Sequence, residues 1–181
     1  MEVILVRHTK VDVPKGMCYG QSDVPVAHSF PQEAETTKSH LEIYMPFDKV
    51  FSSPLSRARL LAAHCGYSDP VIDDRLMEMC FGVYEGVEEC FSIPDCPLVP
   101  FFKEPQNYTV PVEGAESIED LFERTGEFLE DKVYPELEKG KDVLIVGHGA
   151  MNSTIVSRIR GYERKDFWSA GIENCKLMKL L

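Results

Sequence analysis

The 181-residue chain lacks several features that mark common protein classes. No apolar run approaches the ~18 residues that a membrane-spanning helix needs, and no basic segment with a following apolar run marks a secretory signal. Basic residues are few: 19 Lys and Arg stand against 30 Asp and Glu, so the net charge is -11. This balance argues against a nucleic-acid or anionic-membrane partner. We therefore expect a cytoplasmic protein.

The six cysteines follow no metal-binding or disulfide pattern. No two of them form C-x-x-C, and they are scattered through apolar surroundings. We predict reduced, mostly buried thiols, as is usual in a reducing compartment. The sequence predicts neither a metal site nor a cofactor.

Short apolar runs alternate with amphipathic segments along the chain. Strands are expected at 2–7, 49–53 and 142–147, with a closing edge strand at 174–181. Helices are expected at 32–44, 55–65, 117–137 and 151–160, the third capped by Ser117 and the fourth ended by Gly161. The alternation predicts an α/β fold, a three-layer sandwich with a mostly parallel sheet flanked by helices, in one domain over 1–181.

One region interrupts this alternation. Residues 88–114 hold prolines at 94, 97, 100, 105 and 111, a density that predicts no regular element. The region is too apolar for a disordered linker, so we expect an ordered segment packed over the domain. Its aromatic residues have two possible roles, stacking on a substrate ring or pinning the segment to the core: Phe101, Phe102 and Tyr108.

Basic side chains follow three of the expected strands. Arg7 and His8 end the first, His148 ends the strand at 142–147, and Arg57 or Arg59 lies in the first turn of the helix after the second. The carboxyl ends of parallel strands meet at one edge of a sheet. Two helix N-termini add N–H donors there. Arginine, histidine and helix N-termini together predict a site for a phosphate group.

Two other interpretations of these residues compete with a phosphate site. Each residue taken singly is an ordinary charged or hydrogen-bonded side chain at a strand or helix end, but their joint occurrence at three strand ends disfavours this. Two histidines also suggest zinc, although the adjacent Arg7 repels a cation and no further ligand has the usual spacing. The remaining histidines have no such context and are interpreted as structural: His28, His40 and His64.

Four segments, in order, resemble one known family. LVRHT, SSPLSRA, DRLMEMCFGVYEG and IVGHG are similar to the motifs of the histidine phosphatase superfamily, in its phosphoglycerate mutase-like branch. GMCYGQSDVP at 16–25 and the segment 111–117 resemble bacterial alpha-ribazole phosphatases in particular. The resemblance spans nearly the whole chain. It implies a hydrolase for a small-molecule phosphomonoester, with alpha-ribazole 5′-phosphate, and hence cobalamin biosynthesis, as one candidate.

The resemblance also assigns roles. It implies that His8 is the nucleophile that forms a phosphohistidine, that Arg7, Arg57 and His148 hold the phosphoryl oxygens, and that Glu78 is the proton donor. The chemistry is consistent: an imidazole is a competent nucleophile, fixed cations stabilise phosphoryl charge, and a carboxylic acid kept protonated beside a phosphate can protonate the leaving group. As substrate-binding residues we predict Thr9, Gly20, Gln21, Ser22 and Gly149.

Some of these choices rest on the resemblance alone. Composition does not separate Glu78 from Glu85, nor Arg57 from Arg59, and the resemblance favours the first of each pair. The chain also departs from the R-H-G-x-T-x-x-N pattern of many relatives, because the Gly position is Thr9 and the Asn position is Pro14. The contact of that Asn is therefore either absent or supplied by another residue, with Gln21 and Ser22 as candidates.

Two alternative functions remain, a phosphoglycerate mutase-type phosphoryl transfer and a non-catalytic protein that binds phosphorylated ligands. Mutase relatives carry a C-terminal tail over the site, whereas this chain ends at Leu181, just after its last expected strand. That difference favours hydrolysis. The complete set of catalytic residue types favours an enzyme.

Overall fold

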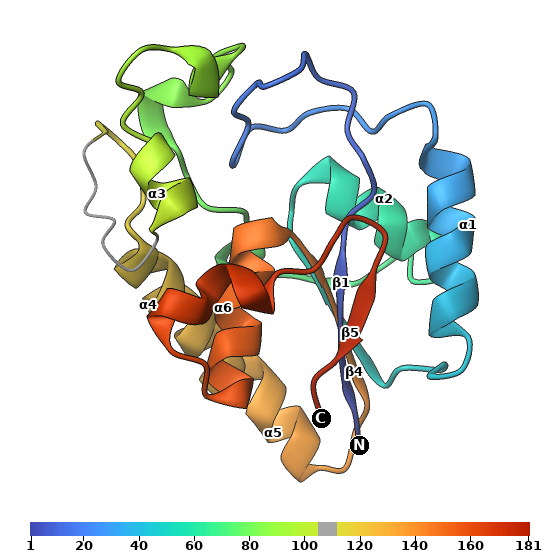
Figure 1. Cartoon of the computed structure of the whole chain (residues 1–181). Coiled ribbons are helices and arrows are strands. Elements are labelled where there is room, and N and C mark those ends of the chain that lie inside the picture. Colours follow the sequence, from blue (N-terminus) through green and yellow to red (C-terminus); the bar gives the residue numbers. More distant parts are fainter. Residues whose placement is uncertain (105–111) are drawn as a thin grey trace.

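A computed structural model describes residues 1–104 and 112–181 and has a mixed sheet at its centre (Figure 1). The strand order is β3-β2-β4-β1-β5, with β1 Val3–Arg7, β2 Lys49–Ser52, β3 Val71–Ile72, β4 Val143–Gly147 and β5 Leu177–Lys179. All neighbours pair in parallel except β5, which is antiparallel to β1 at the edge. The predicted strands are confirmed. The sequence did not predict β3, because its two residues are exposed and too few for a pattern.

The two central strands bring their carboxyl ends together. β1 and β4 are apolar and buried on both faces of the sheet, as expected for strands in a parallel sheet covered on both sides. Their register pairs Val3 with Val143 and Arg7 with Gly147. The next residues, His8 and His148, therefore leave the sheet side by side.

Helices cover both faces of the sheet, which confirms the three-layer sandwich (Figure 1). One buried cluster joins Ile4 and Val146 to α1 and α2, and the other joins Leu5 and Ile145 to α4 and α6. The helices are α1 Phe30–Leu41, α2 Ser56–His64, α3 Val99–Lys103, α4 Ile118–Phe128, α5 Tyr134–Glu138 and α6 Gly149–Arg160.

The expected helix at 117–137 forms, but not as one regular helix. α4 begins with a capping box in which the Ser117 and Asp120 side chains each accept from the other's backbone N–H. A π-helical turn, Leu129–Val133, then leads into α5. α6 ends at Gly161, which adopts the left-handed conformation with φ 69°.

The prediction of no regular element in 88–114 is wrong. The segment holds a 3-10 turn, Cys90–Ser92, and the short helix α3. Pro100 lies in the first turn of α3, where a missing N–H costs no hydrogen bond. The expected packing over the domain is confirmed for the described part, since Leu98 and Phe101 are fully buried. Tyr108 lies outside the described residues.

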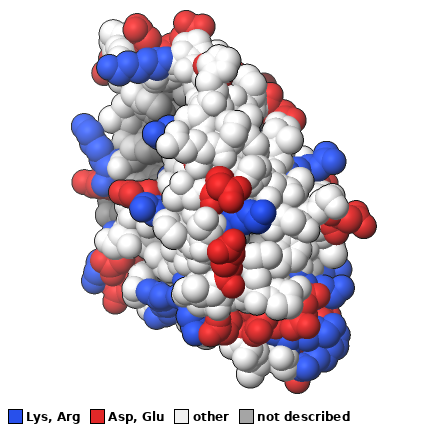
Figure 2. Space-filling model, turned by 90° about the vertical axis from the view of Figure 1, so that its right-hand side faces the viewer, with Lys and Arg blue, Asp and Glu red and all other residues white. Residues whose placement is uncertain are grey.

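The surface and the thiols agree with the composition. On the face that Figure 2 shows, acidic and basic side chains lie interspersed toward the lower end. All six cysteines are free thiols, and four of them are buried, as predicted. Among the described residues, no helix is both long and apolar enough to cross a membrane.

Candidate active site

Buried basic side chains meet at the carboxyl edge of the sheet. His8 follows β1, His148 follows β4, and Arg57 lies in the first turn of α2. The three are at most 1% exposed, and the two imidazole rings lie 5.1 Å apart between centroids. Arg7 joins them from the last position of β1. Charged side chains are rarely buried without a partner, so this cluster needs an explanation.

The hydrogen bonds of His8 determine which of its nitrogens is free. Its Nδ1 lies 2.6 Å from the backbone oxygen of Thr9. A carbonyl oxygen only accepts, so Nδ1 carries the hydrogen and Nε2 carries the lone pair. Burial lowers the pKa of His8 to about 3, helped by the positive charges of Arg57 and Arg7. His8 is therefore a neutral imidazole at pH 7 with a free basic nitrogen.

His148 is neutral for the same reasons. Burial lowers its pKa well below the ordinary value, and His8, Arg57 and Arg7 add to the effect. Its Nε2 lies 2.8 Å from the hydroxyl of Ser53. Its Nδ1 is buried and has no hydrogen-bond partner among the described residues.

The two arginines are positioned by backbone oxygens. Arg57 donates to Gly20 O at 2.7 Å and to Ser22 O at 2.8 Å, and Arg7 donates to Ile172 O at 3.1 Å. Neither arginine takes part in an ion pair between described residues. In each, Nε is buried without a partner there. Unsatisfied buried donors around two positive charges are suited to an anion.

Glu78 lies against this cluster, at the N-terminus of α6. Its carboxylate accepts from the N–H of Ala150 at 3.2 Å and from the N–H of Met151 at 3.1 Å. The adjacent Met79 N–H donates to it as well, at 2.9 Å. These donors hold the carboxylate near Arg7. Both side chains come close to Gly149: a Cβ added at Gly149 would lie 3.1 Å from Arg7 Cζ and 3.3 Å from Glu78 Oε2.

Glu85, the competing carboxylate, has a different environment. It accepts from Ser22 Oγ at 2.7 Å, from Gln21 N–H at 2.9 Å and from Phe81 N–H at 3.1 Å. It therefore ties the 20–22 loop to the chain after Glu78. Gln21 Nε2 donates to the backbone oxygen of Glu78 at 3.0 Å, so the side chains of Gln21 and Ser22 both hold this loop.

The other predicted substrate-binding residues surround the cluster. Thr9 is fully buried next to His8, and its hydroxyl has no partner among the described residues. Gly20 and Gly149 line the pocket beside the cluster. Gly20 has φ +24°, and a Cβ there would come within 2.6 Å of Met79 O. Only glycine allows the loop to pass so close.

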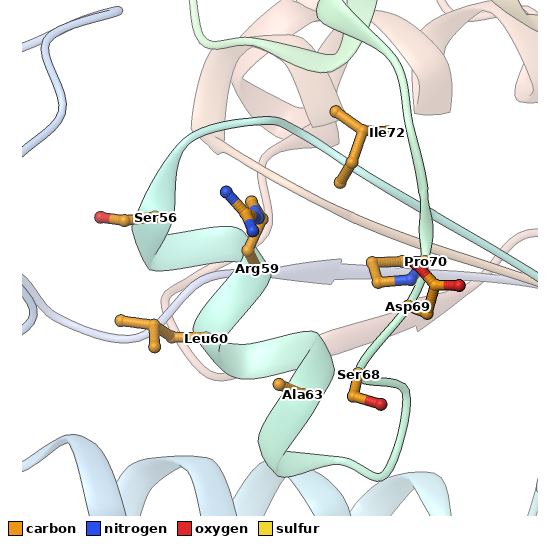
Figure 3. Close-up of a pocket in the computed structure, with 8 residues that line it drawn as sticks. All are labelled: Ser56, Arg59, Leu60, Ala63, Ser68, Asp69, Pro70 and Ile72. Carbon is orange, nitrogen blue, oxygen red and sulfur yellow. The ribbon is translucent and has the colours of Figure 1, made fainter.

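Arg59 does not belong to this cluster. It is exposed and lines a separate surface hollow of about 340 Å³ between α2 and the segment that leads into β3. Figure 3 shows Arg59 in this hollow with Leu60 and Ile72. The helical period separates Arg57 from Arg59, because residues two positions apart lie on different faces of a helix.

Several supporting residues were not predicted from the sequence. Ser53 lies within the SSPLSRA motif but was given no role there, and its hydroxyl contacts His148. Asn174 donates to His8 O at 2.9 Å. Arg124 donates to Glu78 O at 3.1 Å, and its partner Glu116 accepts from Cys80 N–H at 3.1 Å. No local pattern indicates these contacts, because each joins segments far apart in the chain.

Beside the cluster lies a pocket of about 220 Å³. Arg7, Glu78 and Gly149 line it together with aromatic side chains. No group of three or more His, Cys, Asp or Glu residues is arranged for a metal ion in 1–104 and 112–181.

Comparisons with known proteins agree with this geometry. Residues 3–181 match the model of the histidine phosphatase superfamily (branch 1). The 2,3-bisphosphoglycerate-dependent phosphoglycerate mutase of Rhizobium etli is 31% identical over 172 residues, which cover 90% of this chain and 80% of the relative.

Solved structures share the fold at lower identity. Bacillus stearothermophilus YhfR superposes with a TM-score of 0.83 at 22% identity, covering 98% of this chain and 89% of that one. The alpha-ribazole phosphatase of Shigella flexneri superposes with a TM-score of 0.81 at 19% identity, covering 99% and 89%. The family match over nearly the whole chain is the decisive comparison. The chain belongs to the histidine phosphatase superfamily, branch 1, and has the phosphatase or mutase-like function of that family.

Proposed function

We propose that this protein is a metal-independent phosphomonoester hydrolase that works through a phosphohistidine on His8. One observation carries the proposal: a neutral, buried imidazole with a free Nε2 lies among two arginines that form no ion pair with the described residues. Such a site favours a phosphoryl group, and the free His8 nitrogen can act as its nucleophile.

The first step transfers the phosphoryl group to the enzyme. The lone pair of His8 Nε2 forms an N–P bond while the P–O bond to the leaving alcohol breaks, and the electron pair of that bond stays on the oxygen. Glu78 gives its proton to this oxygen. Arg7, Arg57 and His148 hold the phosphoryl oxygens, and the charges of the two arginines are in place before the reaction.

The second step returns the enzyme to its starting state. The Glu78 carboxylate takes a proton from water, and the remaining hydroxide forms a bond to phosphorus. The N–P bond breaks, and its electron pair returns to His8 Nε2. The products are an alcohol and inorganic phosphate, and Glu78 is protonated again. Glu85 stays outside these steps, because its oxygens accept from the 20–22 loop.

The pocket favours a phosphatase over a mutase. A phosphoglycerate carries a carboxylate, and a mutase must hold it and a second phosphate while the intermediate reorients. Among the described residues that line the pocket, Arg7 is the only cation. A second anionic group therefore has no counter-charge there.

The identity of the substrate is a separate part of the proposal. The motif at 16–25 supports alpha-ribazole 5′-phosphate as the candidate, with a place in cobalamin biosynthesis, and Met17, Cys18, Tyr19 and Gly20 of this motif line the pocket. The alternative candidate is the phosphoglycerate mutase reaction, which the curated relative from Rhizobium etli favours.

A substrate panel tests the proposal. The purified protein is assayed in EDTA with p-nitrophenyl phosphate, alpha-ribazole 5′-phosphate, and 3-phosphoglycerate with 2,3-bisphosphoglycerate as primer. We expect release of inorganic phosphate from the first two and no formation of 2-phosphoglycerate. Isomerisation faster than hydrolysis would show a mutase, and tight binding without turnover would show a non-catalytic binding protein. Loss of rate in EDTA, restored by zinc, would show a metal enzyme.

A further inference from the structure

Much of the lining of the pocket beside the phosphoryl centre, the cluster of Arg7, His8, Arg57 and His148, is aromatic. Its rings come from segments far apart in the sequence: Tyr19, Phe81, Phe91, Phe102 and Trp168. Met17 adds a polarizable side chain. This aromatic wall, as these residues are called below, begins directly beside Arg7 and Glu78, which line the same pocket.

Three of the rings are exposed at this one opening. Phe91 and Phe102 are each 41% exposed and Trp168 is 37% exposed. Large aromatic side chains that stay exposed together mark a binding surface more often than an ordinary surface patch. These three rings are not needed to fill the core, because the buried Phe101 and Phe167 fill it beneath them.

Contacts among the rings of the wall, and with the buried Phe101 behind them, hold the rings in place. The Phe102 and Trp168 rings are nearly parallel, at 6°, with centroids 5.8 Å apart. Phe91 stands edge-on to Phe102, with centroids 4.8 Å apart. The buried Phe101 packs against Phe102 at 5.0 Å and against Trp168 at 5.3 Å. The rings are therefore preorganised, which lowers the entropy lost when a ligand binds.

The charges of the pocket exclude a second anionic group. Arg7 is the only cation that lines it among the described residues, and the phosphoryl group uses that charge. A carboxylate on the leaving group would lie near Glu78 and would face aromatic rings elsewhere, so it would lose hydration without gaining a partner.

We propose that the aromatic wall binds the alcohol part of the substrate and selects an uncharged, flat, apolar ring over a carboxylated or purely aliphatic group. The ring stacks on the wall while its phosphate lies at His8. A volume of about 220 Å³ is below the ~300–1,000 Å³ typical of drug-sized ligands, so the pocket fits one ring system. This substrate class rests on the proposed function for the place of the phosphate, but binding alone tests it.

Matched phosphonates, which cannot be hydrolysed, measure the preference without turnover. Dissociation constants are determined by calorimetry for 2-phenylethylphosphonate, 2-cyclohexylethylphosphonate, ethylphosphonate and 2-carboxyethylphosphonate. We expect the phenyl compound to bind about tenfold more tightly than the ethyl compound, because burial and stacking of one ring add about 1–2 kcal/mol. The cyclohexyl compound should fall between them, and the carboxyethyl compound should bind most weakly.

Two variants locate the preference on the wall. Phe102→Leu and Trp168→Leu keep an apolar side chain but remove the ring, and each should lower the phenyl-to-ethyl affinity ratio about 2- to 10-fold. Tyr162→Leu is the control, because Tyr162 is also an exposed aromatic residue, 40% exposed, and does not line the pocket. It should leave the ratio unchanged.

The outcomes separate this inference from the proposed function. Equal affinity for the phenyl and ethyl compounds, or tight binding of the carboxyethyl compound, would overturn the inference even if the enzyme hydrolyses p-nitrophenyl phosphate. A ring preference that both variants lower, in a protein that hydrolyses nothing, would support the inference and overturn only the proposed function. Equal binding of phenyl and cyclohexyl compounds would overturn the selection of a flat ring.

Discussion

At the phosphoryl centre the side chains follow buried strands or begin helices, whereas at the aromatic wall they come from loops and short helical turns. His8, Arg57 and His148 are at most 1% exposed, while Phe102 and Trp168 are 41% and 37% exposed. The centre is polar and bonded to backbone oxygens, and the wall is apolar and held by ring contacts.

This difference divides chemistry from selectivity within one pocket. Phosphoryl transfer needs charges and donors placed within a fraction of an ångström, and strand ends in a sheet provide such rigidity. Recognition of an alcohol needs a surface that can vary, and loops tolerate substitution with little cost to the sheet. Changes in the centre should therefore affect the rate for every substrate, while changes in the wall should affect the ranking of substrates.

The largest effect is expected from His8. His8→Ala removes the proposed nucleophile, so turnover of p-nitrophenyl phosphate should fall more than about 10⁴-fold. Phosphate label should no longer be trapped on the protein after a rapid quench at neutral or alkaline pH, which preserves phosphohistidine. Undiminished labelling of the variant would place the nucleophile elsewhere, with His148 as the first residue to examine.

The next effect separates the two carboxylates. Glu78→Gln should slow hydrolysis of an alkyl phosphate by about two to four orders of magnitude, because a basic alkoxide needs a full proton. Formation of phosphohistidine from p-nitrophenyl phosphate should slow far less, since p-nitrophenolate leaves without one. Stopped-flow and steady-state rates measure the two steps.

Glu85→Gln is the matched control for this experiment. It should show no dependence on the leaving group, because Glu85 accepts from the 20–22 loop. If the rate of Glu85→Gln depended on the leaving group and that of Glu78→Gln did not, Glu85 would be the acid. Equal losses on both substrates in Glu78→Gln would mean that Glu78 only positions the site.

A smaller effect distinguishes the buried and exposed halves of the aromatic region. Phe101 is fully buried, and Phe101→Ala should lower the free energy of unfolding by about 3–5 kcal/mol. Phe102→Ala should cost less than about half of that, since part of its ring is already in water. Urea unfolding monitored by circular dichroism measures both, and equal losses would make Phe102 part of the core rather than of the wall.

The smallest effect is a pH dependence of stability. The folded-state pKa of His8 is about 3, below its ordinary value of 6.5, so between these pH values the unfolded chain binds a proton that the folded chain does not. Stability therefore rises with pH from about 3 to 6.5 and falls as the pH drops. Replacing His8 removes its contribution to the slope of the free energy of unfolding against pH, which is at most about 1.4 kcal/mol per pH unit.

Unfolding of the wild type and His8→Gln at pH 6.5, 5.5 and 4.5 measures that part. The stability difference between the two proteins should shift in favour of His8→Gln as the pH falls. His40→Gln serves as the control because His40 is exposed, and it should leave the slope as in the wild type. A parallel slope for His8→Gln would mean that His8 is protonated in the folded protein near its ordinary pKa.

The layers of the fold and the meeting of the two histidines follow from signals that are local in the sequence. The apolar runs that became β1 and β4 are long enough to define parallel strands, and parallel strands place their ends at one edge. Arg7, His8 and His148 follow directly from that rule. The capping box at Ser117 and the end of α6 at Gly161 are local signals of the same kind.

The contacts between distant segments depend on the tertiary structure. No local signal separates Glu78 from Glu85, and their different hydrogen bonds arise because α6 reaches one and the 20–22 loop reaches the other. α3 formed within a proline-rich segment because Pro100 lies in its first turn and Phe101 gains burial in the core. The aromatic wall joins Tyr19, Phe102 and Trp168, which no periodicity connects. Strands and helix caps are encoded by a few neighbouring residues, so the sequence predicts them. Packing energy is shared among residues that only the folded chain brings together, so the sequence does not predict it.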